Sequence, residues 1–517
     1  MIKKISFSAC LIIPLFSLII AGYRYIVDVP YWDEWGAVSR AAKLFEGQLS
    51  LGDLWKQSNE HRILFPRIIF SFCVYLTKWN NYHFFAIQVF LALCAFFSLI
   101  YSLRKILVKQ QFFISLWLIL VISVILFSLN QYESWLTGMG IPKFLVLFSV
   151  VTGSIILCDT PFSWTKFTLS SLLGIIATYS FGYGLAYWFV GLFMLFVVKI
   201  DHKQTKRWAI FAWSIISLVA ILTYFFKYNF KGSIGSLSGS FQYSLDKPIE
   251  YIDFVLTLLG TSLIGFSHQG AMSMGIVGVI IFLWAFRFFY QTTPSVQSVL
   301  IPFFAFSLYA LGNIFLMGMG RLDFLGSLGA LAPRHRTLPT IFWIANAVFL
   351  SVCYLETNEI NSKKRFSLQK GLIVLSLAVI TVSSILNSVN GGLRMRDRYA
   401  QFGLAARELL KLKNEQLLKL LHPDPELIKK QVGVLRKYKL SYFRRPRDES
   451  ELNYVLLKLK RTNEELLLND GKVFKNDSRE IRGRLDSFSF GTNTLDFKGW
   501  AADINNLQIP ETILVFC

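Results

Sequence analysis

Long apolar runs separated by short polar segments follow one another from residue 6 to residue 390. About eleven of these runs are long enough to cross the roughly 30 Å hydrocarbon core of a bilayer as α-helices. In lipid a helix satisfies all of its own backbone hydrogen bonds, so the pattern predicts an all-α polytopic membrane protein. The predicted membrane-spanning helices are residues 6–24, 83–103, 112–129, 142–158, 167–182, 183–199, 208–226, 272–288, 298–317, 338–354 and 371–390.

Two further apolar stretches, residues 63–78 and 251–268, are ambiguous as membrane spans. Lys and Arg concentrate in the cytoplasmic loops of membrane proteins, and this bias provides a test. With a cytoplasmic N-terminus and the spans given above, the basic clusters within residues 104–109, 199–207 and 363–370 all fall on the cytoplasmic side. Counting either ambiguous stretch as a span would place some of these clusters outside. Both stretches are therefore predicted to be interfacial or re-entrant helices on the outer side.

The same topology places the chain after residue 390 on the outer face, and there the pattern changes. Residues 391–480 are charged with apolar residues at helical spacing, and HPDPELI (422–428) is typical of a break that starts a new helix. From residue 481 the stretches LDSFSF, TLDFKGWA and ETILVF are strand-like. The prediction is a transmembrane domain (1–390), a helical extramembrane region (391–480) and a short β-rich segment (481–517).

The composition agrees with a membrane protein and narrows its partners. Hydrophobic residues make up 54% of the chain and charged residues 16%, with a formal net charge of +21. Nucleic acid would be the expected partner of a soluble protein with this charge, but here the basic residues cluster in short loops and the C-terminal tail, where anionic lipids attract them. We therefore predict membrane lipids and no nucleic acid as partners. The six cysteines and six histidines show no spacing typical of a disulfide framework or a zinc site.

The conspicuous polar groups fall on the predicted outer side. The first outer loop, residues 25–82, is the longest between spans and carries DVPYWDEW (28–35) and NEHR (59–62). Three later outer turns read NQYESWLTGMG, YSFGYGLAYW and GRLDFLGSLGALAPRHRT. Basic residues in an outer loop run against the positive-inside trend, and charge near the bilayer is costly, so these loops are predicted to carry function.

Acidic, basic and aromatic residues in these loops suit group transfer from a phosphate-linked lipid. Guanidinium groups bind phosphate oxygens bidentately and keep their charge in a low dielectric. A carboxylate can take the proton from an attacking hydroxyl. Each element also has a simpler alternative: an interfacial aromatic belt, a solvated acidic loop, or the arginines 334 and 336 as anchors to lipid head groups.

The motifs YWDEW, NEHR and FPR in a long first outer loop resemble the GT-C superfamily of integral-membrane glycosyltransferases, which use polyprenyl-phosphate sugars. Together with YSFGYGLAYW and GRLDFLG…APRHRT, they are similar to the serotype-converting O-antigen glucosyltransferases of bacteria and their phages. The resemblance implies a GT-C-like fold for residues 1–390 and an inverting transferase of the bacterial inner membrane. It implies undecaprenyl-phosphate-glucose as the donor and a hydroxyl of lipid-linked O-antigen as the acceptor, both on the periplasmic side.

The resemblance also implies roles for single residues. A carboxylate of the first outer loop would be the general base, with Asp33 as the first candidate and Glu34 as the reserve. No fixed metal or other cofactor is implied, and a divalent ion held by a carboxylate is left open. The donor phosphate would be held by Arg62, Arg334 and Arg336. The other residues expected to bind or orient substrate are Tyr31, Trp32, Trp35, His61, Arg321 and Glu60, the last of these as a partner of Arg62.

Two other functions are compatible with the sequence. Polysaccharide polymerases and ligases of the cell envelope also combine many spans with a large outer loop, although that loop usually comes late in the chain and here it comes first. A transporter or flippase for lipid-linked sugars would be favoured by inverted repeats or by broken helices at mid-membrane. The sequence shows no convincing repeat. The oligomeric state is not predicted.

Overall fold

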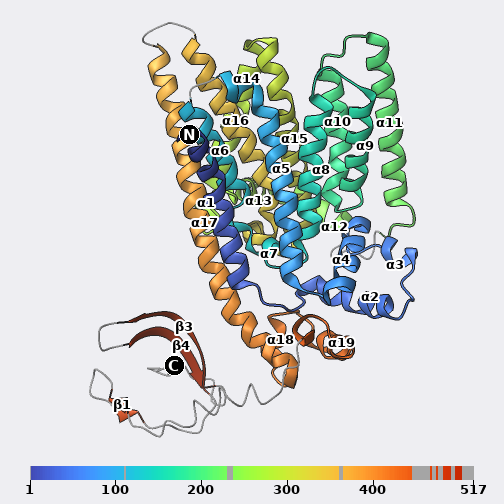
Figure 1. The fold of residues 1–517 in the computed structure, drawn as a ribbon, viewed down its shortest axis with the longest axis vertical. Coiled ribbons are helices and arrows are strands. Elements are labelled where there is room, and N and C mark those ends of the chain that lie inside the picture. The colour runs from blue at the N-terminus through green and yellow to red at the C-terminus, as the bar shows by residue number, and fades with distance from the viewer. Residues whose placement is uncertain are drawn as a thin grey trace.

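The computed structural model describes residues 2–109, 112–229, 237–359 and 365–444, together with four strands between residues 466 and 503. The chain is nearly all helical, and the long helices stand side by side in one bundle (Figure 1). The helices of the first half of the chain are α1 (Ile2–Tyr25), α2 (Trp35–Phe45), α3 (Leu51–Trp55), α4 (Leu64–Thr77), α5 (Asn81–Lys109), α6 (Phe112–Leu126), α7 (Tyr132–Trp135), α8 (Gly140–Cys158), α9 (Trp164–Thr178), α10 (Ala186–Val197) and α11 (Lys203–Phe225).

The second half of the chain continues the bundle and ends in short helices outside it (Figure 1). Its helices are α12 (Leu237–Asp246), α13 (Pro248–Gly260), α14 (His268–Gln291), α15 (Pro294–Leu325), α16 (Thr337–Glu359), α17 (Arg365–Lys411), α18 (Glu415–Lys419) and α19 (Pro425–Lys437). Short 3₁₀ helices complete the turns: η1 (Trp32–Glu34), η2 (Leu129–Gln131), η3 (Gly182–Leu185), η4 (Ser327–Leu331), η5 (Pro333–His335) and η6 (Ser441–Arg444).

Eight helical segments of the described chain are long and apolar enough to cross a membrane, so the chain is a multi-pass membrane protein. A helix also occupies each of the other predicted spans, as α1, α9 and α10. The full count of about eleven spans stays a prediction, because α9 and α10 are shorter than 18 residues and only Ile12–Tyr25 of α1 counts toward the length and hydropathy criteria. The eight segments are Asn81–Arg104, Ser115–Trp135, Gly140–Cys158, Lys203–Phe225, His268–Gln291, Pro294–Leu325, Thr337–Glu356 and Gln369–Lys411.

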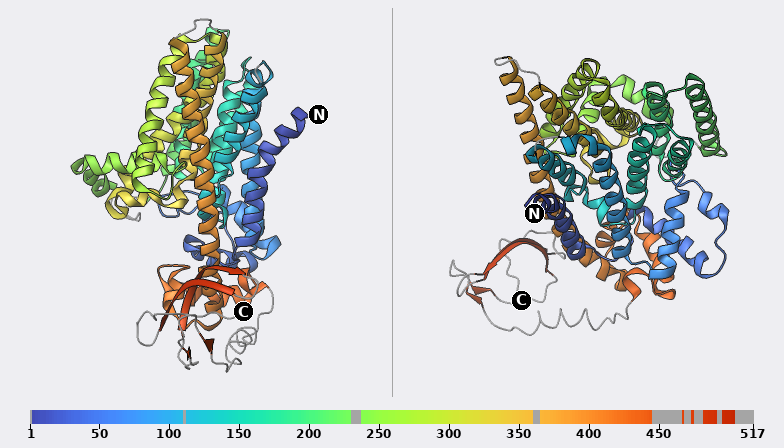
Figure 2. Two further views of the ribbon diagram at one scale, coloured as in Figure 1. Left: turned by 90° about the vertical axis from the view of Figure 1, so that its left-hand side faces the viewer. Right: turned by 45° about the horizontal axis from the view of Figure 1, so that its top comes forward.

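The two ambiguous apolar stretches form α4 and α13, which have 14 and 13 residues. At 1.5 Å per residue such helices reach about 20 Å, less than the roughly 30 Å of hydrocarbon. Neither is among the eight candidate spans. Together with α12, the start of α13 projects sideways from the bundle (Figure 2).

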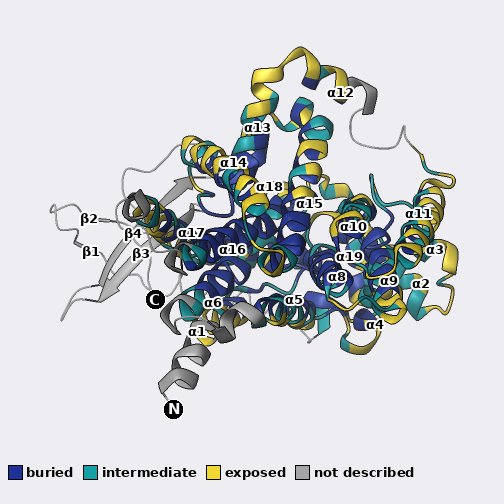
Figure 3. Cartoon of the chain, turned by 90° about the horizontal axis from the view of Figure 1, so that it is seen from above, coloured by how far each residue is buried: buried dark blue, intermediate teal, exposed yellow. Residues whose placement is uncertain are grey.

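Burial separates central helices from peripheral ones (Figure 3). In the most apolar window of α16, 94% of the residues are buried, against 22% for α11. The exposed residues of α11 include Trp208, Phe211, Ile215, Leu218 and Leu222, which follow one another at intervals of three or four along one face. A stripe of this kind is unfavourable in water and fits contact with lipid chains.

The polar loops gather at the end of the bundle where α2, α3, α4, α18 and α19 lie, and we call this end the site face (Figure 1). The chain connecting α10 to α11 and that connecting α14 to α15 lie at the opposite end (Figure 1). The molecule therefore presents most of its extramembrane mass on one side.

A second hydrophobic core joins the first loop to the C-terminal helices on the site face. Trp35 and Val38 of α2 belong to the same buried cluster as Phe402 of α17 and Ile428 and Leu435 of α19. The two regions are more than 350 residues apart in the sequence. The first loop is thus packed against the C-terminal helical region.

Polar contacts reinforce this packing. The Asp28 carboxylate accepts the backbone N–H of Asn81 at 3.0 Å and is paired with the Arg444 guanidinium. The helix predicted at HPDPELI is confirmed: α19 begins at Pro425, and the Asp424 side chain accepts the N–H of Glu426 at 2.9 Å.

The boundary expected at residue 390 falls inside α17, which runs unbroken from Arg365 to Lys411. Residues 445–465 of the region expected to be helical (391–480), and the strand expected at ETILVF, lie outside the described residues. A folded β-rich segment at the C-terminus stays a prediction. The strands form two antiparallel pairs, β1 (Leu466–Leu467) with β2 (Val473–Phe474) and β3 (Ile481–Phe490) with β4 (Leu495–Asp503).

Candidate functional site

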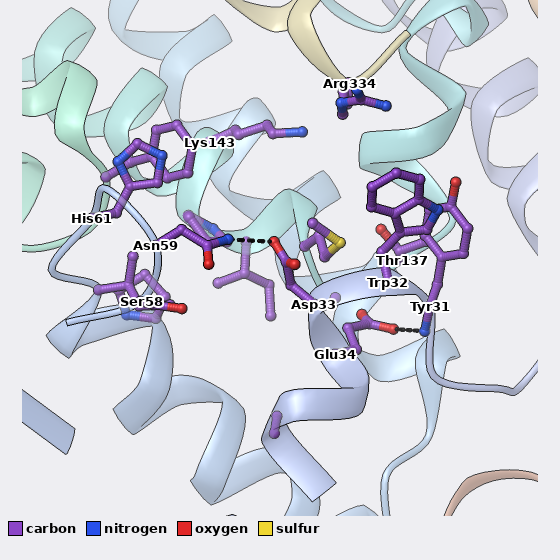
Figure 4. Close-up of a pocket in the computed structure, with 18 of the residues that line it drawn as sticks. Tyr31, Trp32, Asp33, Glu34, Ser58, Asn59, His61, Thr137, Lys143 and Arg334 are labelled. Atoms are coloured by element: carbon purple, nitrogen blue, oxygen red, sulfur yellow. Dashed lines mark hydrogen bonds between the residues drawn. The ribbon is translucent and has the colours of Figure 1, made fainter. Parts of the chain in front are cut away.

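The acidic motif of the first loop forms a tight turn at the start of α2. The N–H of Tyr31 donates to the Glu34 carboxylate at 2.7 Å, and the N–H of Trp32 donates to the carbonyl of Leu421 at 2.8 Å. Trp32 has a φ of +49°, a left-handed conformation that costs a non-glycine residue on the order of 1 kcal/mol or more. These bonds hold the turn so that Asp33 faces a cavity (Figure 4).

The NEHR motif forms a second tight turn opposite the first. The N–H of Ser58 donates to the carbonyl of His61, and the N–H of His61 donates to the carbonyl of Ser58, both at 2.8 Å. The turn presents Asn59, whose side-chain amide donates to Asp33 Oδ2 at 3.3 Å (Figure 4). The amide of Asn59 thereby fixes the orientation of the Asp33 carboxylate.

His61 closes the same wall as a neutral ring. Its imidazole packs on Phe181 with the ring centroids 3.8 Å apart. Burial lowers the pKa of His61 to about 3, and the nearby Arg321 acts in the same direction. His61 is therefore uncharged near neutral pH and shapes the cavity without adding charge to it.

The cavity has a volume of about 440 Å³, which is in the range of small-molecule sites. Segments far apart in the sequence line it, and every polar loop that the sequence singled out contributes. These segments are residues 31–40, 58–70, 133–143, 181–183 and 321–335. The predicted site residues among the lining are Tyr31, Trp32, Asp33, Glu34, Glu60, His61, Arg321 and Arg334.

Two arginines line the cavity with loosely paired guanidinium groups. Arg334 Nη1 lies 3.9 Å from Glu133 Oε2, and Arg321 Nη2 lies 3.8 Å from Glu60 Oε2. Both distances exceed the length of a hydrogen bond. The two guanidinium groups can therefore still donate to an anionic ligand.

Lys143 adds a third basic side chain to the cavity and is absent from the residues predicted from the sequence. It lies in the first turn of α8, and its Nζ donates to Ser134 Oγ at 3.2 Å. Figure 4 shows the side chains of Lys143, Arg334 and Asp33 extending toward the same space. A lysine within the apolar run GIPKFLVLF is costly unless it serves a function, so this position carries the signal that could have identified it.

Glu34 occupies an environment quite unlike that of Asp33. Its side chain is 4% exposed, and burial raises its pKa to about 7, although the hydrogen bond from Tyr31 favours the charged form. Gly138 packs so closely that a Cβ there would lie 2.8 Å from Glu34 Oε1. Glu34 is therefore part of the support of the turn, whereas Asp33 is exposed to the cavity.

Arg62 lies outside the cavity lining, although it was expected to bind phosphate. It is 3% exposed and donates to the carbonyls of Trp55 at 3.1 Å and of Tyr224 and Phe226. Its guanidinium thus ties the first loop to the end of α11. Glu60, expected to orient Arg62, is paired with Arg321 instead.

Arg336 is likewise outside the lining. It is 6% exposed and donates to the carbonyls of Gly265 at 2.7 Å and Leu331 at 2.6 Å and to the side chain of Asn130. These bonds join three loops and use the donors of the guanidinium, so Arg336 stabilises the fold and is not placed to bind phosphate. Trp35 is fully buried in the second core, so it cannot serve as a face for a sugar.

No group of three or more His, Cys, Asp or Glu side chains within the described ranges could hold a metal ion. Comparisons with known protein families, with curated proteins and with solved structures found no significant match. The function is therefore argued from the chemistry of the cavity and from the motifs that line it.

Proposed function

We propose that the cavity is the active site of an inverting glycosyltransferase of the bacterial inner membrane. The enzyme would move glucose from undecaprenyl-phosphate-glucose to a hydroxyl of lipid-linked O-antigen polysaccharide on the periplasmic face. The main support is that one cavity of a multi-pass membrane protein combines the carboxylate of Asp33 with the basic side chains of Arg321, Arg334 and Lys143. The resemblance of YWDEW and NEHR to GT-C motifs supports the choice of donor.

In the proposed reaction Asp33 is the general base. It takes the proton of the acceptor hydroxyl while the hydroxyl oxygen attacks the anomeric carbon of the donor sugar. The bond between that carbon and the phosphate oxygen breaks, and the electron pair leaves with the phosphate. One displacement at the anomeric carbon inverts its configuration.

The leaving phosphate gains negative charge as this bond breaks. Arg321, Arg334 and Lys143 would hold it, since hydrogen-bond donors already in place stabilise such charge most effectively in a site that excludes water. They replace Arg62 and Arg336, whose donors are committed to backbone and side-chain groups of the fold. The exposed ring of Trp32 offers a flat face for the sugar.

The rim of the cavity also suits a donor with a long hydrocarbon tail. Phe324 and Leu325 at the end of α15 line the cavity, and Phe324 is 41% exposed. A prenyl chain passing over these side chains would continue along the apolar surface of the bundle. The phosphate would then remain at the site face.

The test is transfer by the purified protein in liposomes containing donor and acceptor. The wild-type protein should yield an acceptor heavier by one hexose, and Asp33→Asn should reduce the rate by about 10²-fold or more. Glu46→Gln, which changes an exposed carboxyl of the same loop, is the matched control and should retain full transfer.

Three results would contradict the proposal. Full transfer by Asp33→Asn would remove the base assignment. A gain of a whole polysaccharide repeat would indicate a polymerase or ligase. Movement of the lipid-linked sugar across the membrane with no change in acceptor mass would indicate a transporter.

A further inference from the structure

Arg398 lies on α17, outside the cavity lining, and contacts two aromatic rings. Its guanidinium carbon is 4.1 Å from the centroid of Tyr31 and 4.1 Å from that of Phe402. The residue is 9% exposed. The two rings also contact each other, with centroids 5.2 Å apart, and the guanidinium lies against both. Contact with two rings holds a guanidinium in position, because each ring attracts the cation.

Glu133 connects this arginine to the cavity. Arg398 Nη1 lies 3.8 Å from Glu133 Oε1, while Arg334 Nη1 lies 3.9 Å from the other carboxylate oxygen. The Arg334 guanidinium in turn lies 5.4 Å from the centroid of Trp32. Tyr31 and Trp32, the two residues before Asp33, are thus each in contact with an arginine, and the two arginines share one carboxylate.

The turn that these residues hold needs support. The left-handed conformation of Trp32 is unfavourable by itself, and the hydrogen bond from its N–H to Leu421 comes from the C-terminal helical region. Arg398 belongs to the same region. The position of the turn is therefore determined by contacts with a part of the chain that lies far away in the sequence.

We propose that Arg398 is a positioning residue for the transfer reaction: through Tyr31 and through Glu133 it fixes the turn that presents Asp33 to the cavity. The inference rests on the proposed function. The C-terminal helical region would then take part in catalysis without touching the substrate, by determining where the general base lies.

Kinetics distinguish this role from a contribution to stability alone. Arg398→Gln should lower kcat for hexose transfer by about tenfold or more, since a small displacement of a catalytic group has a large effect, and the donor KM should stay within about twofold. Arg398→Lys, which keeps the charge and loses the planar guanidinium, should fall between Arg398→Gln and wild type. Arg407→Gln, an exposed arginine of the same helix, is the matched control and should match wild type.

A double-mutant cycle tests whether Arg398 acts through Tyr31. If it does, Arg398→Gln combined with Tyr31→Leu should lose no more kcat than the more damaging single change. If the fold reductions in kcat of the two single variants multiply in the double variant, the two residues act separately. Unchanged kcat in folded Arg398→Gln protein, or a loss confined to KM, would also overturn the proposal.

A structural measurement keeps this inference separable from the proposed function. 3-Fluorotyrosine placed at position 31 should give a ¹⁹F signal that is shifted and broadened in Arg398→Gln and unchanged in Arg407→Gln. This result is expected even if wild-type protein transfers no hexose, in which case the proposed function fails and the contact is retained. An identical signal in Arg398→Gln would show that Arg398 does not position the turn.

Discussion

Asp33 and Glu34 are neighbours in the sequence and occupy opposite environments. Asp33 is exposed to the cavity and is oriented by Asn59, while Glu34 is buried and accepts the N–H of Tyr31. A general base must be able to reach a substrate hydroxyl, and of these two lining side chains Asp33 is the exposed one. The contrast favours Asp33 as the base in the proposed reaction and gives Glu34 the task of holding the turn.

The raised pKa of Glu34 makes the stability of the protein depend on pH. The pKa increases from 4.5 to about 7 in the folded state, so folded protein binds this proton more tightly than unfolded protein. The contribution of Glu34 to the free energy of unfolding is therefore fully present below pH 4.5. It is lost as the pH rises through about 7, by roughly 3 kcal/mol in total. Glu34→Gln removes the ionisation and keeps an oxygen acceptor for Tyr31, so its melting temperature in detergent should fall less than that of wild type across this range.

Glu46→Gln provides the comparison for this measurement. Glu46 is exposed, and its hydrogen bond from Tyr438 lowers its pKa, so its replacement cannot remove a decline caused by a raised pKa. The Glu46 variant should lose stability with rising pH as wild type does. If the melting temperatures of wild type and Glu34→Gln fall equally with rising pH, the folded protein does not raise the pKa of Glu34.

At the scale of elements, two arginines of one loop have different tasks. Arg336 bonds to the buried carbonyl group of Gly265 and to the half-buried one of Leu331, whereas Arg334 points into the cavity with 29% of its side chain exposed. Removing the Arg336 guanidinium leaves the buried Gly265 carbonyl unsatisfied, at about 1–3 kcal/mol. Arg336→Ala should therefore lower the melting temperature strongly.

Arg334→Ala, two residues away, is the contrasting variant. It should melt close to wild type and lose affinity for the donor, because its ion pair with Glu133 is long and partly exposed. A thermal melt and a donor titration on both variants decide the assignment. If Arg336→Ala melts like wild type and binds the donor more weakly, Arg336 binds the donor phosphate as the sequence predicted.

The positions of the helices were predictable because length and hydrophobicity determine a membrane span. A helix lies at each of the predicted spans, and the two ambiguous stretches form the short helices α4 and α13. The change expected at residue 390 is only one of composition. Charged residues such as Lys and Arg are good helix formers, so α17 continues through that point to Lys411.

The candidate site was predictable only to the level of its loops. The sequence shows which turns share a face, but it does not show where a long side chain points within a turn. Arg62 and Arg336 point into the protein, while Lys143 points into the cavity from the start of an apolar helix. Arg398 could not be found from the sequence, since its contact with Tyr31 depends on how α17 packs against the first loop.

The whole molecule has two unlike ends. The end opposite the site face carries Arg104, Lys166, Lys203, Lys206 and Arg207 near the ends of its helices. Basic residues concentrate on the cytoplasmic side of membrane proteins. The proposed function requires the site face in the periplasm, where a donor on the outer leaflet would reach the cavity.

Cysteine labelling in cells tests that orientation. In a chain with Cys10, Cys94 and Cys517 replaced by serine, the remaining Cys73, Cys158 and Cys353 are buried and should not react. Single cysteines at the exposed positions Gln48 and Gln416 mark the site face, and those at Asp201 and Gln291 mark the opposite end.

A maleimide that does not cross the inner membrane should label the Gln48→Cys and Gln416→Cys variants in cells whose outer membrane is permeable. The Asp201→Cys and Gln291→Cys variants should react only after the inner membrane is opened. The reverse pattern would place the cavity in the cytoplasm and remove the periplasmic donor from the proposed function. Labelling of one position from each pair would contradict the arrangement of the helices itself, because all positions at one end of a bundle must face the same compartment.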